Sequence, residues 1–270
     1  MKHLDYARCK QKTISRPISL EGIGLHSGEE TNIVISPAPA NSGLFFLKDG
    51  ERIPATVDQV AQTKRGTTLK NIAVTEHLLA AAYGLEIDNL QIEVQGNELP
   101  VMDGSALPFV DALETAGIVE QNEEKTSFKL TQKIKVQDND AWLIAEPYDG
   151  LKVDFMVKFP YLGEQKLSLE LSPETFKREI APARTFGYLE EVEELKAQGL
   201  ARGASEKNAL VLGKEGYLNQ PRFPDELVRH KILDLFGDIA LLGQSLQAAI
   251  SANKSGHKLN IELVRRLKQL

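Results

Sequence analysis

Hydrophobic and polar positions in the first half of the chain alternate in the manner of a β-sheet. Thr31–Ser36 alternates apolar with polar residues and is rich in β-branched side chains, which predicts a strand. Leu44–Ala55 predicts a hairpin with its turn at Lys48-Asp49-Gly50-Glu51, because Asp-Gly favours a tight turn. We expect a further strand at Asn89–Val94.

Two short apolar segments with helical spacing lie on either side of that last strand. The first predicts a helix over Thr75–Tyr83, with Thr75 as its N-cap. The second predicts a helix over Ser105–Ala116, capped by Ser105.

The pattern restarts after Glu120–Lys125, a charged stretch without apolar periodicity that we interpret as an interdomain linker. Beyond it we expect strands at 128–136, 141–146, 151–158 and 165–171, followed by helices at 190–198 and 225–242. A strand at 246–251 and a closing helix at 260–270 complete the chain. Each half thus contains strands followed by helix, strand and helix. The sequence therefore predicts an α+β protein of two similar domains, residues 1–125 and 126–270, each a β-sheet with two helices.

Composition narrows the class of protein. The 270 residues are 42% hydrophobic and 26% charged, as in soluble globular proteins. The net charge of −6 argues against a nucleic-acid partner, because phosphate binding needs a dense basic surface. No segment approaches the roughly 18 apolar residues of a membrane span, and Met1–Gln11 lacks the apolar centre of a signal peptide. We expect a cytoplasmic protein without stable membrane insertion, and a small-molecule partner.

The single cysteine, Cys9, limits the kind of metal site that the chain can build. One cysteine excludes an internal disulfide and a cysteine-rich zinc site. Any metal must therefore be held by histidine and carboxylate side chains.

His230 and Asp234 are the first candidate ligands. They lie four residues apart in a predicted helix, so both side chains share one face and could bind one metal ion. A surface pair without a metal is the alternative, because this spacing often occurs by chance. Asp238 adds a third polar residue to the same stripe of an otherwise apolar helix. Burying acids without partners is costly, so a shared site explains all three residues better.

His77 is polar within the apolar segment Thr75–Tyr83. Alone, it fits a core histidine that binds a backbone carbonyl. Glu76 beside it changes this interpretation, because adjacent helix positions point about 100° apart. At the start of a helix, one side chain can hold a metal while the other faces a water molecule. Zinc hydrolases commonly use three protein ligands and a nearby carboxylate base.

Two further histidines lie in glycine-containing segments that we expect to be loops. His257 ends Lys254-Ser255-Gly256-His257, where a protonated imidazole could donate a proton to a leaving amine; an ordinary loop histidine is the alternative. His26 lies in the glycine-rich segment Gly22–Gly28. No helical pattern follows that segment, so it does not indicate a dinucleotide-binding motif.

Five motifs occur together in one order: Thr75-Glu76-His77-Leu78, Met102-Asp103-Gly104-Ser105-Ala106, Ala183-Arg184-Thr185-Phe186-Gly187, Val228-Arg229-His230-Lys231-Ile232-Leu233-Asp234 and Lys254-Ser255-Gly256-His257. Together they closely resemble the UDP-3-O-acyl-N-acetylglucosamine deacetylases, the zinc enzymes of lipid A biosynthesis in Gram-negative bacteria. The resemblance runs from about residue 13 to the end. This chain departs from the family pattern at Gln62–Val74, where it is shorter than typical members. The resemblance therefore does not extend to the rim of the pocket.

The resemblance implies a fold and a metal. The fold has two domains, each a sheet with two helices, packed so that the helices lie between the two sheets. One zinc ion per chain would be held by His77, His230 and Asp234. The activity implied is removal of the N-acetyl group of UDP-3-O-acyl-N-acetylglucosamine with release of acetate, the committed step of lipid A biosynthesis. We expect a monomer.

The resemblance also implies the catalytic roles. Glu76 matches the general base that activates water. His257 matches the general acid, held charged with help from Asp238. Lys231 and Thr185 match the groups that stabilise the tetrahedral oxyanion.

Substrate contacts follow less directly. By resemblance, Phe159, placed by its distance from the Thr185 motif, would stack on the uracil, and Lys254 would meet the diphosphate. His26 belongs to the matching glycine-rich segment. Val192 and Leu195 recur at helical spacing on an otherwise acidic segment. With Phe186, they would line the passage for the acyl chain; a surface helix packed on its own domain is the alternative.

Two other functions stay open at this point. A zinc amidohydrolase for a different N-acyl substrate would have the same metal ligands and a different pocket. A non-catalytic homologue that binds a metal or a nucleotide is disfavoured, because the acid, the base and all three ligands are present together.

Overall fold

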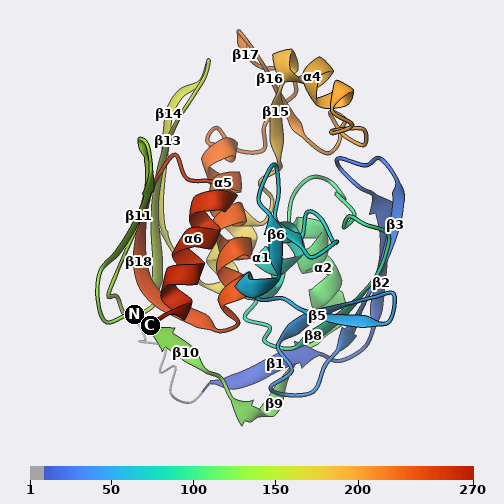
Figure 1. Cartoon of the computed structure of the whole chain (residues 1–270), viewed down its shortest axis with the longest axis vertical. Coiled ribbons are helices and arrows are strands. Elements are labelled where there is room, and N and C mark those ends of the chain that lie inside the picture. The colour runs from blue at the N-terminus through green and yellow to red at the C-terminus, as the bar shows by residue number, and fades with distance from the viewer. Residues whose placement is uncertain (1–8) are drawn as a thin grey trace.

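Two β-sheets enclose a layer of helices in the computed structural model, which describes residues 9–270 (Figure 1). Most of Met1–Gln11, on which our signal-peptide argument relied, lies outside the described residues. The first sheet has the strand order β2 (Ile18–Ile23), β3 (Glu30–Pro37), β8 (Leu90–Gln95), β4 (Leu44–Lys48), β5 (Glu51–Pro54). The second has the order β11 (Ile134–Asp138), β12 (Ala141–Glu146), β18 (Ser245–Asn253), β13 (Leu151–Phe159), β14 (Gly163–Glu170), with β10 (Ser127–Lys129) also paired to β18.

The two sheets have the same topology. In each, two hairpins come first in the chain, and the last strand inserts between them. This central strand, β8 or β18, runs parallel to one neighbour and antiparallel to the other. The structure therefore confirms two similar α+β domains. Their exact division at residue 125 stays a prediction.

The helices occupy equivalent places in the two domains. α1 (Glu76–Gly84) and α2 (Leu107–Thr115) precede and follow β8, and α5 (Glu226–Ile239) and α6 (His257–Lys268) precede and follow β18. All four lie between the sheets (Figure 1). α1 packs directly against α5, and both are buried over almost their whole length.

Gly237 of α5 allows this close helix packing. A Cβ atom at this position would lie 2.2 Å from the carbonyl oxygen of Glu76, so any larger residue would push the two helices apart. Burial on all sides explains why both segments are apolar around most of their circumference. It also explains why the few polar residues of α1 and α5 meet one another.

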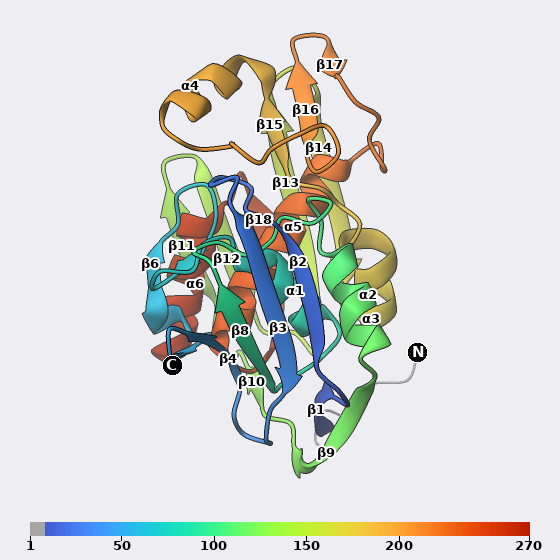
Figure 2. The same ribbon diagram turned by 90° about the vertical axis from the view of Figure 1, so that its right-hand side faces the viewer.

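A smaller module stands beyond the ends of the two sheets (Figure 2). It contains β15 (Phe186–Tyr188), β16 (Leu210–Gly213), β17 (Gly216–Tyr217), a single 3-10 turn at Leu189–Glu191 and α4 (Val192–Ala197). The remaining short elements are β1 (Lys10–Ile14), β6 (Val60–Gln62), β7 (Thr68–Leu69), β9 (Ile118–Glu124), α3 (Pro173–Thr175) and single turns at Val57–Gln59, Phe176–Ile180 and Ala240–Leu242. No described helix has both the length and the apolar character needed to cross a membrane.

The segment Glu120–Lys125, which we interpret as an interdomain linker, has regular structure in the protein. Most of it belongs to β9, which pairs antiparallel with β1 through partners such as Thr13 and Val119. A two-stranded ribbon is held by its backbone hydrogen bonds, so its side chains can be charged on either face. Composition alone could not reveal this strand.

Two further boundaries and one helix cap differ from the prediction. The strand expected at 128–136 is two strands, β10 and β11, separated by a turn after the buried Leu130. Thr75 occupies the N-cap of α1 but its hydroxyl donates to the carbonyl of Thr67 instead of capping the helix. The N-cap of α2 is Ala106, not Ser105.

Candidate functional site

A cavity of about 820 Å³ opens where the smaller module faces α1, α5 and α6. We distinguish three parts of its lining. The polar floor consists of Glu76, His77, Thr185, His230, Lys231, Asp234 and His257. The apolar wall consists of Phe186, Leu189, Val192, Leu195, Leu210 and Leu218, and the charged rim of Asp138, Asp140, Lys254 and Lys258.

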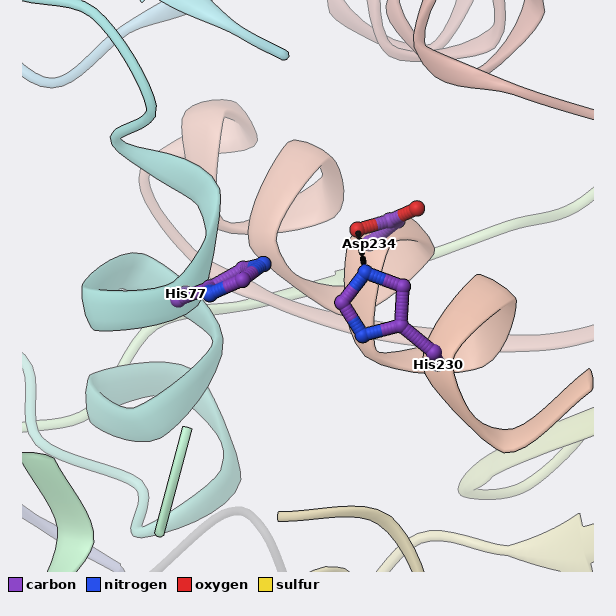
Figure 3. A group of neighbouring side chains, drawn as sticks. All are labelled: His77, His230 and Asp234. Carbon is purple, nitrogen blue, oxygen red and sulfur yellow. Dashed lines mark ion pairs between the residues drawn. The ribbon is translucent and has the colours of Figure 1, made fainter. Parts of the chain in front are cut away.

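Three residues of the polar floor form a possible metal site (Figure 3). His77 comes from α1, and His230 and Asp234 come from α5. Each offers one ligand atom, and these atoms lie within 4.8 Å of one another. His230 Nε2 is 3.3 Å from Asp234 Oδ1, and the two imidazole rings meet edge to face with centroids 5.1 Å apart. The structure thus brings the three predicted ligands together.

Burial gives these side chains the protonation states that a divalent cation requires. It lowers the pKa of His77 to about 3 and lowers the pKa of His230, so both imidazoles are neutral near pH 7. His230 Nδ1 lies 3.1 Å from the carbonyl of Ala183 and donates to it, which leaves the Nε2 lone pair facing Asp234. Neutral imidazole and ionised carboxylate are the forms that bind metals.

Lys231 and Asp234 form an ion pair beside this cluster. Burial opposes ionisation of Asp234, but nearby positive charge, foremost that of Lys231, outweighs burial and holds the pKa of this carboxyl below its ordinary value. Lys231 Nζ lies 2.8 Å from Asp234 Oδ2, and its side chain lines the cavity. The ammonium group is therefore held next to any group that occupies the cluster.

Glu76 lies next to this cluster, with one carboxylate oxygen within 4.8 Å of ligand atoms of Asp234 and His257. Its Oε2 accepts the backbone N–H of Thr67 at 2.9 Å, and its Oε1 is 3.7 Å from His257 Nε2. Burial raises the pKa of Glu76 to about 7. A carboxyl group with that pKa can accept a proton near neutral pH and return it.

His257 is the first residue of α6, with Gly256 as N-cap, and not part of a loop as we had expected. Its Nδ1 lies 2.8 Å from Asp238 Oδ2. Burial alone would lower the pKa of His257, but Asp238 and Asp234 outweigh burial and raise it to about 9. The imidazole is therefore charged near pH 7, with Nε2 directed toward Glu76.

Thr185 reaches the polar floor through contacts from both domains. Its backbone N–H donates to the carbonyl of Gly104 at 2.8 Å, and its carbonyl accepts the N–H of Leu210 at 2.8 Å. The preceding residue, Arg184, forms a buried ion pair with Glu226, with Nε 2.9 Å from Oε1. These bonds fix the backbone that carries Thr185.

The other predicted substrate residues lie in different surroundings. Phe186 lines the cavity, and Val192 and Leu195 of α4 lie on the apolar wall with it. Phe159 is not among the lining residues: it is 6% exposed and packs edge to face against Phe186, with centroids 5.5 Å apart. This geometry gives no support to stacking of Phe159 on a uracil.

The segment Gln62–Val74, expected to be shorter than in typical members, contacts the cavity. Arg65 forms an ion pair with Glu191 of the smaller module at 3.0 Å. The backbone carbonyl of Arg65 lies 2.9 Å from His26 Nε2, which places His26 in the lining. Lys254, on the charged rim, forms an ion pair with Asp140.

Two buried residues next to the polar floor were absent from our sequence prediction. The Thr67 hydroxyl donates to Asp238 Oδ1 at 2.5 Å, and Asn260 Nδ2 donates to Asp238 Oδ2 at 2.9 Å. Asn260 is 1% exposed and Thr67 is 0% exposed. The sequence offered one indication of Asn260, because it is a polar residue among apolar ones in a predicted helix. For Thr67 the local sequence offered none.

Comparison with known proteins agrees with this geometry. Residues 11–269 match the family model described as UDP-3-O-acyl N-acetylglycosamine deacetylase, LpxC. The chain is 43% identical over 271 residues to the UDP-3-O-acyl-N-acetylglucosamine deacetylase of Oleidesulfovibrio alaskensis, covering 96% of this chain and 89% of the relative. It is 42% identical to those of Coxiella burnetii, over 96% and 90%, and Shewanella pealeana, over 94% and 88%. The chain therefore belongs to the UDP-3-O-acyl-N-acetylglucosamine deacetylase family.

Proposed function

We propose that this protein hydrolyses the N-acetyl group of UDP-3-O-acyl-N-acetylglucosamine and releases acetate, which is the committed step of lipid A biosynthesis. One observation carries the proposal: Glu76 Oε1 and His257 Nε2 face each other at 3.7 Å beside the cluster of His77, His230 and Asp234. A base and an acid are thus held next to each other at the edge of a possible metal site, where both can reach a bound amide.

The residues present fit a zinc ion. Two neutral imidazoles and one carboxylate are a common ligand set of catalytic zinc sites, and none of the three needs a cysteine. The other ring nitrogen of His230, Nδ1, donates a hydrogen bond through its N–H to the Ala183 carbonyl, as metal-binding histidines usually do. When bound, zinc supplies a Lewis acid that polarises the amide carbonyl and makes water more acidic.

Glu76 acts first as a general base. Its carboxylate takes a proton from water as the water oxygen forms a bond to the carbonyl carbon. The Thr67 N–H, which donates to Oε2, leaves Oε1 directed to the cavity side. Because its pKa is raised to about 7, Glu76 is a stronger base than an exposed carboxylate and is still substantially ionised at neutral pH.

His257 completes the reaction as a general acid. The tetrahedral species collapses when the carbon–nitrogen bond breaks, and His257 Nε2 donates its proton to the departing amine nitrogen. Asp238 holds the imidazole through Nδ1 and favours its charged form. The products are acetate and the free amine.

Lys231 and Thr185 stabilise the negative oxygen that forms between these two steps. The ammonium group of Lys231 supplies positive charge, and the hydroxyl group of Thr185 supplies a hydrogen-bond donor. Both residues line the cavity next to the ligand cluster. Preorganised donors of this kind contribute roughly 3–4 kcal/mol to barrier lowering in other hydrolases.

The rest of the cavity suits an amphiphilic substrate. The apolar wall, including Phe186, Val192 and Leu195, would receive the acyl chain, because burial of each methylene contributes about 0.8 kcal/mol. Lys254 on the charged rim would bind the diphosphate. His26, which lies within the glycine-rich segment Gly22–Gly28, would also contact the substrate. We also propose that the protein is a monomer and that it acts in the cytoplasm. Size-exclusion chromatography tests the oligomeric state, and cell fractionation tests the location.

Turnover of defined substrates tests the function. Purified protein is given UDP-3-O-acyl-N-acetylglucosamine, and release of acetate and appearance of the free amine are measured. UDP-N-acetylglucosamine, which lacks the acyl chain, and a simple N-acetyl amide serve as comparisons. We expect turnover of the acylated substrate by far the fastest. Hydrolysis of the simple amide alone would indicate another amidohydrolase, and bound zinc without turnover would indicate a non-catalytic homologue.

A further inference from the structure

Thr67 connects the base and the acid of the site although it does not line the cavity. Its backbone N–H donates to Glu76 Oε2 at 2.9 Å. Its hydroxyl lies 2.5 Å from Asp238 Oδ1 and 3.1 Å from His257 Nδ1. The side chain is fully buried and absent from the residues that line the cavity. One residue of the first domain thus contacts three groups that would act in hydrolysis or support it.

The hydrogen-bond geometry determines where the protons lie. The single hydroxyl hydrogen of Thr67 points to the Asp238 carboxylate at 2.5 Å, so its oxygen presents a lone pair to His257 Nδ1. Nδ1 then faces two acceptors, this lone pair and Asp238 Oδ2 at 2.8 Å, and must carry a hydrogen. The imidazole is thereby oriented with Nε2 toward Glu76.

The surroundings of Thr67 are built to hold it in this place. Gly66 precedes it with φ +151, and a Cβ atom there would lie 3.0 Å from Glu76 Oε1. Glycine therefore lets the backbone approach the carboxylate. On the other side, the Thr67 carbonyl accepts both the backbone N–H of Thr75 at 3.1 Å and its hydroxyl at 3.0 Å. The segment is thus tied to the start of α1, which carries Glu76.

We propose that Thr67 is a positioning residue for the deacetylation, whose hydroxyl aligns the Asp238–His257 pair with Glu76 across the two domains. This inference rests on the proposed roles of Glu76 and His257. Asp238 has a second donor in Asn260, which holds the carboxylate from within the second domain. Thr67 adds the contact that sets this pair relative to the first domain.

Thr67→Val tests the proposal, because valine has nearly the same shape, keeps the backbone N–H and lacks the hydroxyl. Thr67→Ser restores the hydroxyl. Thr68→Val is the matched control: Thr68 is the next residue, and its side chain makes no hydrogen bond to the described residues. For each variant, kcat, KM and zinc content are measured with the acylated UDP substrate, alongside wild type and Glu76→Gln.

We expect Thr67→Val to lower kcat about 10- to 100-fold, as loss of a supporting hydrogen bond does in other metal sites. KM should change less than about twofold, because the residue does not line the cavity. Thr67→Ser should retain most of the turnover, and Thr68→Val should equal wild type. If Thr67→Val does not fold, Thr67→Ala is measured by the same criteria.

Two results would overturn the proposal. One is a Thr67→Val protein as active as Thr68→Val. The other is a Thr67→Ser protein that loses as much activity as Thr67→Val, since this would show a requirement for shape and not for the hydroxyl. Glu76→Gln separates these results from a failure of the proposed function: if that variant keeps full turnover, the assignment of the base is wrong whatever Thr67 does.

Discussion

The polar floor and the apolar wall of the same cavity are built in opposite ways. Floor residues such as Glu76 and Asp234 are buried and hydrogen-bonded. Glu76 accepts the backbone N–H of Thr67, and Asp234 accepts a hydrogen bond from Lys231. On the wall, Leu210 is fully buried, but Leu189 is 54% exposed, Leu218 is 52% exposed, and α4 has no buried residue. The floor rests on the packed helices α1 and α5, whereas the wall belongs to the smaller module.

The proposed function accounts for this difference. Charge stabilisation depends on direction and distance, so acids, bases and ligands must be held in place before the substrate arrives. The hydrophobic effect depends on area and has no preferred direction, so an acyl chain can bind to a less ordered surface. Substitutions on the floor should therefore impair chemistry, and substitutions on the wall should impair binding.

The largest effect is expected at the ligand cluster. His77→Ala or Asp234→Ala should reduce zinc to well below one ion per chain and turnover below detection, because two ligands cannot hold the metal in place. Metal analysis after gel filtration measures the occupancy. His26→Ala, a cavity histidine outside the cluster, should keep its zinc. Full occupancy in both cluster variants would show that the ligands lie elsewhere.

The next largest effect concerns acid and base. Glu76→Gln and His257→Ala should keep zinc yet lower kcat by about 10²- to 10⁴-fold, the usual contribution of a general acid or base. Steady-state kinetics on zinc-loaded proteins gives the value. Near wild-type kcat in both variants would contradict the proposed roles of Glu76 as base and His257 as acid.

The pH dependence separates these two roles. Glu76 works deprotonated, so kcat/KM should fall about tenfold per pH unit below its pKa of about 7. His257 works protonated, so kcat/KM should fall likewise above its pKa of about 9. His257→Ala should lose the alkaline limb and keep the acidic one. A flat profile between pH 5 and 10 in the wild type would argue against both assignments.

The smallest effect is expected on the wall. Leu195→Glu or Val192→Glu places a charge on the acyl passage and should raise KM for a long-acyl substrate roughly tenfold, the equivalent of about two unburied methylenes. A short-acyl analogue should be affected much less, and kcat and zinc should be unchanged. Leu195→Met, which conserves volume, is the control. Equal effects on both substrates would favour a helix that merely packs on its own domain.

Local patterns predicted much of the scaffold. The hairpin at Leu44–Ala55 formed where Asp49 and Gly50 adopt the positive φ angles that its turn requires. The i,i+4 spacing of His230 and Asp234 put both on one face of α5, because the helical repeat alone decides this. Such features depend on neighbours within a few residues, and the printed sequence contains them.

Other features were beyond local reasoning. The strand β9 was missed because its stability comes from pairing with β1, more than a hundred residues earlier in the chain for pairs such as Lys10 and Glu124. His257 was placed in a loop because α6 begins without a capping side chain. Phe159 was assigned by distance from a motif, although the β13–β14 hairpin directs it into the packing around Leu210.

By itself, the sequence determined the types of reactive group, their helical spacing and, through five ordered motifs, the family. Only the tertiary structure decided which groups meet. The contact of Thr67 with Asp238 spans 171 positions, and it exists because α1 and α5 pack closely at Gly237 and bring the two domains together. Periodicity reports on bonds within an element, whereas the distance between elements is set by how their side chains pack. The alignment of acid, base and ligands is therefore a property of the assembled domains.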